Sequence, residues 1–241
     1  MLSSVKQSLN IPEDDFIGIF LYGSQNYHLD TEDSDVDTIV LVHSADKPRK
    51  ELVTPIGKTK IYTIKYFIDR LKQGDLECYE ILYTKYRIVK PDYNDILNEF
   101  VSKFSKVMSY ERIKRSLLIK LYEHLSHALW IPRTDENARY NKKRLYWSMR
   151  VYNQLERILD GESFEASLVY ISSLGHDLVK IKTIPNYLSL REFNEMYKLL
   201  VEFHDSSPRY LNAIIDEEDA CLSDFYNNIT MKLNNKGGDS P

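Results

Sequence analysis

The stretch that decides the fold reads LYGSQNYHLDTEDSDVDTIVLV and spans residues 21–42. An apolar run ends at Gly23 and Ser24, and a polar spacer follows. Asp35 and Asp37 then flank one valine at the start of a second apolar run. Short apolar runs bounded by turn residues are typical of buried strands. The pattern therefore predicts two core strands with a pair of carboxylates at the mouth of the second.

Residues two apart on a strand point to the same face, so Asp35 and Asp37 are expected to project together. Two neighbouring carboxylates repel each other, and a cation such as Mg²⁺ between them relieves the repulsion. Gly23 permits close approach of a ligand to the backbone, and Ser24 can offer its hydroxyl and N–H to a phosphate. An Asp-x-Asp pair alone is more often a solvated turn, but this combination favours phosphoryl or nucleotidyl transfer.

The apolar patterning predicts an α+β protein in which a small mixed β-sheet core precedes an all-helical domain. We expect the divisions 1–95 for the α/β domain, 96–233 for the helical domain and 234–241 for a flexible tail. The expected strands are Phe16–Tyr22, Asp37–Val42, Lys60–Ile64 and an edge strand at Tyr86–Val89. The expected helices are 65–72, 75–83, 93–130, 140–159, 164–174, 189–203 and 217–233.

Composition narrows the function classes. The chain has 241 residues, 43 % of them apolar. Its net charge of −4 excludes a protein that coats nucleic acid through a basic surface over the whole molecule, but it does not exclude a local basic groove. Cys78 and Cys221 show neither metal-ligand nor disulfide spacing. No stretch is long and apolar enough for a membrane span, and the N-terminus lacks a signal core. We expect a cytoplasmic protein, and its oligomeric state stays open.

The Gly-Ser, spacer and Asp-x-Asp series resembles the DNA polymerase β-like nucleotidyltransferase superfamily. Later segments are similar to a bacterial and phage branch of predicted nucleotidyltransferases that includes proteins associated with RNA ligases. These segments are YTIKYFIDRLKQGDLECYEILY (62–83), ARYNKKRLYWSMRVYNQLERILDGE (138–162) and YLSLREFNEMYKLL (187–200).

The resemblance implies a reaction in which two Mg²⁺ (or Mn²⁺) ions assist transfer of a nucleoside monophosphate from an NTP to a hydroxyl. Asp35 and Asp37 would hold the metals, and Gly23 and Ser24 would bind the β,γ-phosphates. The acceptor is expected to be an RNA 3′ end or tRNA, with a protein side chain or a small molecule as open alternatives.

The resemblance also implies a third carboxylate on a later strand, and here the sequence departs from the family. The stretch GKTKIYTI (57–64) contains no acid. Glu51, Glu77 and Glu80 are the candidates for a substitute, and Glu80 is the one we select as catalytic. The missing acid keeps a second hypothesis open, in which the chain binds nucleotide or RNA without turnover.

Three basic residues complete the predicted site. Lys65, at the start of a helix, could reach a phosphate, although a solvated surface lysine is the plainer interpretation. Lys143 and Arg150 lie seven residues apart and so share one helix face, among basic and aromatic neighbours suited to a nucleotide or a single strand. An ordinary solvated helix face is the alternative for both residues.

Overall fold

A computed structural model gives the fold of the chain, which forms two compact units. Unit 1 comprises residues 1–26, 34–109 and 213–241, and unit 2 comprises residues 27–33 and 110–212. Within the described residues no helix has the length and apolarity needed to cross a membrane. The structure describes residues 2–9, 11–27, 29–30, 34–44, 49–54, 57–130, 138–169, 177–181, 195, 198, 202 and 216–236.

Unit 1 contains a five-stranded mixed sheet with the order β3-β4-β2-β1-β5. β2 and β4 run parallel, whereas the other neighbouring pairs are antiparallel. The predicted core strands and the edge strand are confirmed. β3 was not predicted, because its sequence RKELVT is charged and lacks an apolar face. The strands are β1 (Phe16–Tyr22), β2 (Asp37–Val42), β3 (Arg49–Thr54), β4 (Gly57–Thr63) and β5 (Arg87–Val89).

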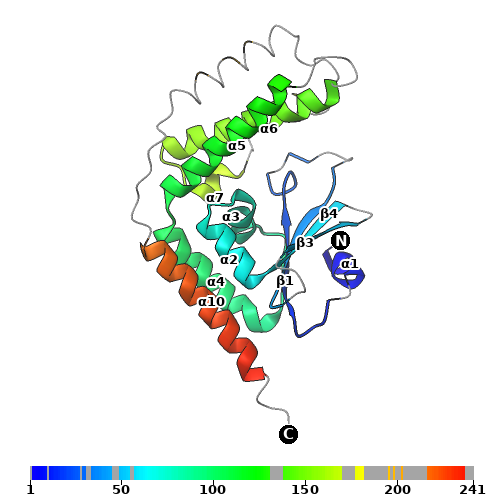
Figure 1. Cartoon of the computed structure of the whole chain (residues 1–241), viewed down its shortest axis with the longest axis vertical. Coiled ribbons are helices and arrows are strands. Elements are labelled where there is room, and N and C mark those ends of the chain that lie inside the picture. The colour runs from blue at the N-terminus through cyan, green and yellow to red at the C-terminus, as the bar shows by residue number, and fades with distance from the viewer. Residues whose placement is uncertain are drawn as a thin grey trace. The chain divides into compact units, whose positions relative to one another are not determined.

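The two faces of the sheet are covered by different helices. Ile19, Val40 and Ile61 form a core on one face, against which α1 (Leu2–Ser8) packs. The other face is covered by α2 (Ile64–Lys72) and α3 (Leu76–Tyr83), as Figure 1 shows. The end of β1 and the start of β2 meet at one rim of this second face.

Side-chain caps fix where α2 and α3 begin. Thr63, the last residue of β4, accepts a hydrogen bond from Tyr66 N, so the strand turns directly into α2. Asp75 caps α3 through the backbone amides of Glu77 and Cys78, and it also accepts a hydrogen bond of 2.8 Å from Arg70 Nε. These caps set the orientation in which α3 presents its side chains to the sheet.

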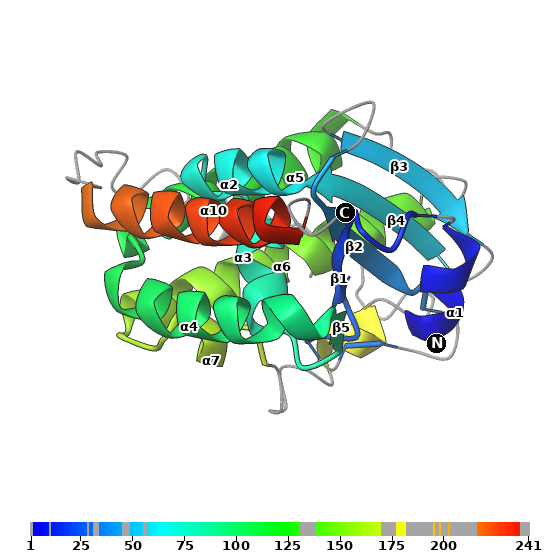
Figure 2. The same ribbon diagram turned by 90° about the horizontal axis from the view of Figure 1, so that it is seen from below.

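Two helices far apart in sequence close unit 1. α4 (Pro91–Val107) lies beside α10 (Asp216–Lys236), where the rings of Phe100 and Phe225 stack at 3.9 Å, and α10 also contacts α2 (Figure 2). The expected division at residue 95 therefore does not match the compact units, because the apolar faces of α4 and α10 pack within the sheet unit. The expected tail starts too early, since α10 continues to Lys236.

A buried hydrogen bond fastens α10 to α3, and its removal should weaken the fold. Tyr79 Oη donates to Glu218 Oε1 at 2.6 Å, and both side chains are buried. We expect Tyr79→Phe to lower the free energy of unfolding by about 2 kcal/mol, because the buried carboxyl group of Glu218 loses its hydrogen-bond donor. Urea unfolding measures the change, and Tyr226→Phe on the more exposed side of α10 is the control. Equal stability of the two variants would contradict this role.

Unit 2 is helical in the part that the structure describes. α5 (Tyr110–Trp130) packs along α6 (Ala138–Leu159), and the short α7 (Phe164–Ser167) follows. The helical stretch expected at 93–130 is interrupted at Met108 and Ser109, which separate α4 from α5. The helix expected at 164–174 ends at Ser167. The helix expected at 189–203 lies almost wholly outside the described residues, as does residue 170 onward of the 164–174 helix. The α+β fold class is confirmed.

Candidate functional site

A buried carboxyl group accepts hydrogen bonds from the Gly-Ser turn. Gly23, with a φ of +88°, donates its N–H to Glu80 Oε1 of α3 at 2.6 Å. Asn26 Nδ2 donates to the same oxygen at 3.1 Å and to Leu21 O at 2.9 Å, and Thr84 Oγ1 donates to Asn26 Oδ1 at 2.6 Å. Because Glu80 is only 3 % exposed, this network is shielded from water and fixes the turn.

Asp37 lies directly beside this turn. Tyr22 and Asp37 are register partners on β1 and β2, so Gly23 follows the residue that pairs with Asp37. A Cβ built on Gly23 would stand 3.8 Å from Asp37 Oδ2, and Asp37 Oδ1 accepts a hydrogen bond from Lys58 N at 3.1 Å. The structure therefore brings the predicted phosphate turn and the predicted metal-binding carboxylate together.

The segment that carries both aspartates is packed tightly against β4. Gly57 has a φ of +152°, and a Cβ on it would come closer than 3.0 Å to the backbone of Val36. Val36 is the residue between Asp35, which is exposed, and Asp37. Gly57 thus fixes the path of the Asp-Val-Asp segment by allowing the two backbones to touch.

β4, the strand next to Asp37, carries lysines on the face where the family pattern implies a third carboxylate. Ile39 pairs with Lys60 in register, so Lys58 and Lys60 share the sheet face of Asp37. Lys60 Nζ lies 2.5 Å from Glu77 Oε2 and 4.9 Å from the centre of the Tyr22 ring. The Lys60 side chain is 12 % exposed, so its ammonium is enclosed by this cluster.

Negative charge gathers around the Tyr22 phenol. Burial raises the pKa of Tyr22 well above its usual value, and the carboxylates of Glu77 and Asp37 raise it further. The phenol therefore stays protonated at neutral pH. Lys60, which is ion-paired with Glu77, lies over the ring of Tyr22, and Tyr22 is the register partner of Asp37.

Two carboxylates, those of Asp35 and Asp37, belong to the segment that enters β2 and could hold Mg²⁺. Mg²⁺ often uses one or two carboxylates and takes its remaining ligands from water and substrate phosphates, which Asp35 and Asp37 could support. Within the described part of the chain, however, no three Asp, Glu, His or Cys residues gather as a metal site. Glu80 Oε1 accepts hydrogen bonds from the turn, and a role for Glu80 as the third carboxylate stays a prediction.

The other two acids considered as substitutes are engaged elsewhere. Glu51, on the edge strand β3, forms ion pairs with Arg49 at 3.3 Å and Lys58 at 3.7 Å. Glu77 forms the ion pair with Lys60. Neither side chain joins Asp35 and Asp37 in a three-carboxylate group.

The predicted basic residues are spread over both units. Lys65 is exposed near the start of α2 in unit 1. Lys143 is exposed on α6 in unit 2. Arg150 is only 7 % exposed, and its guanidinium lies 4.0 Å from the centre of the Tyr27 ring and 4.5 Å from that of Trp147. The aromatic packing of Arg150 identifies it as a core residue of unit 2, and a role for it in nucleotide binding stays a prediction.

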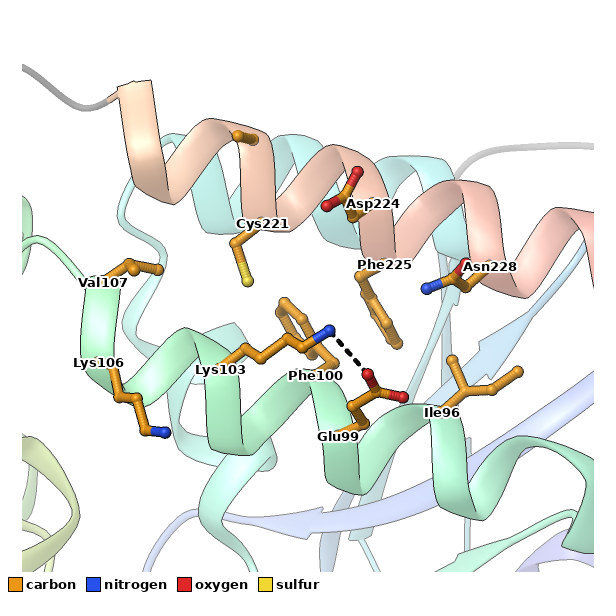
Figure 3. Close-up of a pocket in the computed structure, with 11 residues that line it drawn as sticks. Ile96, Glu99, Phe100, Lys103, Lys106, Val107, Cys221, Asp224, Phe225 and Asn228 are labelled. Carbon is orange, nitrogen blue, oxygen red and sulfur yellow. Dashed lines mark ion pairs between the residues drawn. The ribbon is translucent and has the colours of Figure 1, made fainter.

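A separate pocket of about 420 Å³ lies between α4 and α10, and it shares no residue with the turn or with Asp37. Figure 3 shows Phe100 and Phe225 at its floor and an ion pair between Lys103 and Glu99 at its edge. The free thiol of Cys221 also lines it. Of its two lysines, Lys103 and Lys106, the first is paired with Glu99 of the same helix, and the lining points to no particular ligand.

Sequence reasoning missed Asn26, Thr84 and Gly57 as parts of the site. Asn26 lies inside the predicted polar loop, and its proximity to Gly23 was the available signal. Thr84 ends α3 and meets Asn26 only through folding, so no local pattern marks it. The glycine at the start of β4 was readable as a turn residue, but its contact with Val36 spans two strands.

Comparison with known proteins adds a distant likeness. No protein-family model matches the chain, and no curated protein is similar in sequence. A solved structure with a related arrangement is a nucleotidyltransferase-like protein from Exiguobacterium sibiricum, with 10 % identity and a TM-score of 0.31. That match covers 96 % of this chain and 73 % of the other. At this distance the functional assignment depends on the residues of this chain itself.

The role assigned to Glu80 gives a direct test. We expect Glu80→Gln to lower the free energy of unfolding by about 1–2 kcal/mol, because the amide group replaces a carboxyl oxygen that accepts from both Gly23 N and Asn26 Nδ2. Glu99→Gln, at an exposed position on α4, is the control. Urea unfolding measures stability, and Mn²⁺ titration measures ion binding. Loss of ion binding with unchanged stability would instead make Glu80 a metal ligand.

Proposed function

We propose that the chain is a divalent-metal-dependent nucleotidyltransferase that binds the triphosphate of an NTP at the Gly23–Ser24 turn, next to Asp35 and Asp37. The observation that carries the proposal is the placement of Asp37 Oδ2 against Gly23, where a Cβ would lie 3.8 Å away. A side-chain-free turn next to a carboxylate leaves room for a phosphate that shares a cation with that carboxylate.

Each residue of the turn has a distinct part in this proposal. The N–H of Gly23 is engaged by Glu80, so the hydroxyl and N–H of Ser24 are the groups offered to phosphate oxygens. Asp35 and Asp37 hold Mg²⁺ or Mn²⁺, which would neutralise phosphate charge as it shifts toward the leaving group. Asp37 is oriented for this by the Lys58 amide.

The proposed reaction is the transfer of a nucleoside monophosphate. An acceptor hydroxyl oxygen bonds to the α-phosphorus of the NTP, the bond from that phosphorus to the bridging oxygen breaks, and pyrophosphate leaves while the hydroxyl proton passes to water. An RNA 3′ end or a tRNA is the proposed acceptor class. Lys65, exposed near the start of α2, is a proposed contact for the phosphates, and Lys143 on α6 for the nucleotide or acceptor.

The decisive experiment measures the transfer of a radioactive label from an NTP to an acceptor. The protein is incubated with each α-³²P-labelled NTP, Mg²⁺ or Mn²⁺, and total RNA or cell extract, in parallel with the Asp35→Ala/Asp37→Ala variant. Label transferred by the wild type and not by the variant supports the proposal. Absence of transfer from every NTP, or equal transfer by the variant, overturns it.

A second function is favoured by a specific observation. β4 presents Lys58 and Lys60, and no acid, to the face of Asp37, so the group that would activate an acceptor hydroxyl is missing among the described residues. The chain would then bind a nucleotide or RNA without turnover. Saturable binding of an NTP that depends on Asp35 and Asp37, with no transfer to any acceptor, would establish this alternative.

A further inference from the structure

We infer that this site takes a single divalent cation, because Lys60 presents a fixed ammonium on the sheet face of Asp37, where a second ion would need a further carboxylate. The inference rests on the proposed function for the identity of the site. It goes further by fixing the number of ions and by assigning Lys60 as the residue that sets it.

The sheet register places Lys60 on the same sheet face as Asp37. Tyr22, Asp37 and Lys60 come from three adjacent strands and project from one face, since Tyr22 pairs with Asp37 and Lys60 pairs with Ile39. The hydroxyls of Thr38 and Thr59 meet at 2.9 Å on the opposite face, which confirms the alternation. Lys60 is therefore diagonal to Asp37, and its ammonium reaches the ring of Tyr22, which is the register partner of Asp37.

Two contacts hold the Lys60 ammonium in place. Glu77 Oε2 lies 2.5 Å from Nζ, and the Tyr22 ring lies beneath it at 4.9 Å. With 12 % of its side chain exposed, Lys60 cannot swing into water without breaking both contacts. Its positive charge is thus a fixed part of the site.

The number of ions depends on the charge of the site and on the number of ligands that its residues provide. Two metal ions about 4 Å apart need bridging carboxylates and several anionic ligands to offset their repulsion. The described residues provide Asp35 and Asp37, with no third acid, His or Cys gathered beside them. A second ion would meet a fixed ammonium instead of a ligand, whereas one ion can complete its shell with water and phosphate.

The test counts Mn²⁺ ions without nucleotide. Free Mn²⁺ is followed by electron paramagnetic resonance during titration of the wild type, Lys60→Asp and Lys60→Met, with Asp35→Asn/Asp37→Asn as background. We expect one Mn²⁺ for the wild type, and binding tighter by about tenfold or more in Lys60→Asp, which gains a carboxylate and loses a cation. Lys60→Met, which only loses the cation, should show a smaller gain of about threefold.

Lys50→Asp is the matched control. Lys50 is exposed on β3 and pairs in register with Ile61, so it makes the same charge change on the opposite sheet face. We expect less than about a twofold change in Mn²⁺ affinity. Two Mn²⁺ ions on the wild type, or equal affinities for Lys60→Asp and Lys50→Asp, overturn the inference.

Failure of this inference and failure of the proposed function are distinguishable. The ion count uses Mn²⁺ alone, and the proposed function is tested by label transfer from NTPs. If Lys60→Asp tightens Mn²⁺ binding as expected while no NTP donates label, the single-ion site stands and the transferase proposal falls. Circular dichroism of each variant verifies that the fold is intact, and Lys60→Met keeps the inference testable should Lys60→Asp unfold.

Discussion

Asp37→Asn is expected to weaken binding of a Mg²⁺–nucleotide complex about 100-fold, which corresponds to about 2.7 kcal/mol. The change removes one negative charge beside the Gly23 turn and leaves the shape of the side chain. The asparagine Oδ1 can still accept the hydrogen bond from Lys58 N, which lies 3.1 Å from Asp37 Oδ1. The affinity should therefore fall without a matching loss of stability.

Titration of the protein with a fluorescent ATP analogue in Mg²⁺ measures this effect. Asp69→Asn is the control, because Asp69 is an exposed carboxylate on α2 and the net charge changes equally. Urea unfolding of both variants verifies that the folds remain comparable. Equal nucleotide affinities for the two variants would show that Asp37 holds no cation in the complex.

Local patterns were sufficient to locate four of the five described strands, including the two that carry the Gly-Ser turn and Asp37, but not the charged β3. The runs Phe16–Tyr22 and Asp37–Val42 are apolar throughout, and each is bounded by polar or turn residues. A buried strand needs no partner information to be recognised in this way. Their antiparallel pairing then places Gly23 beside Asp37, because Tyr22 and Asp37 are opposite one another in the register.

The contacts that support the site could not be predicted from the sequence, because they join residues far apart in the chain. Glu80 was chosen as an acid for the metal, and in the structure it reaches the turn from a helix 57 residues further along the chain, where its Oε1 accepts the hydrogen bond from Gly23 N. Only the packing of α3 on the sheet decides which way that carboxylate points. The same holds for α10, whose stacking on α4 through Phe225 moves it from the expected helical domain into unit 1.

The lysines of β4 show a second limit of prediction from the sequence. The absence of an acid in this strand was visible in the sequence, but what replaces it was not. The register with β2 and the ion pair with Glu77 show that Lys60, a positively charged residue, lies on the face where an acid was expected. Lys60 therefore places a positive charge on the sheet face of Asp37, on the strand where the family pattern has an acid.

Gly57→Ala is expected to destabilise the fold by about 3 kcal/mol and to weaken Mn²⁺ binding at Asp35 and Asp37. About 1–2 kcal/mol comes from the positive φ of +152°, and the rest from the clash of a Cβ with the backbone of Val36. The backbone of Val36 cannot rotate away as a flexible side chain would. The Asp-Val-Asp segment must therefore shift as a whole, and both carboxylates shift with it.

Gly161→Ala separates the two causes. Gly161 also has a positive φ, +94°, but a Cβ there would meet nothing within 4 Å. We expect it to cost about 1 kcal/mol of stability and to leave Mn²⁺ binding unchanged. Urea unfolding and Mn²⁺ titration of both variants make the comparison. If Gly57→Ala loses no more stability than Gly161→Ala and binds Mn²⁺ as the wild type does, close packing of Gly57 on Val36 does not position the aspartates.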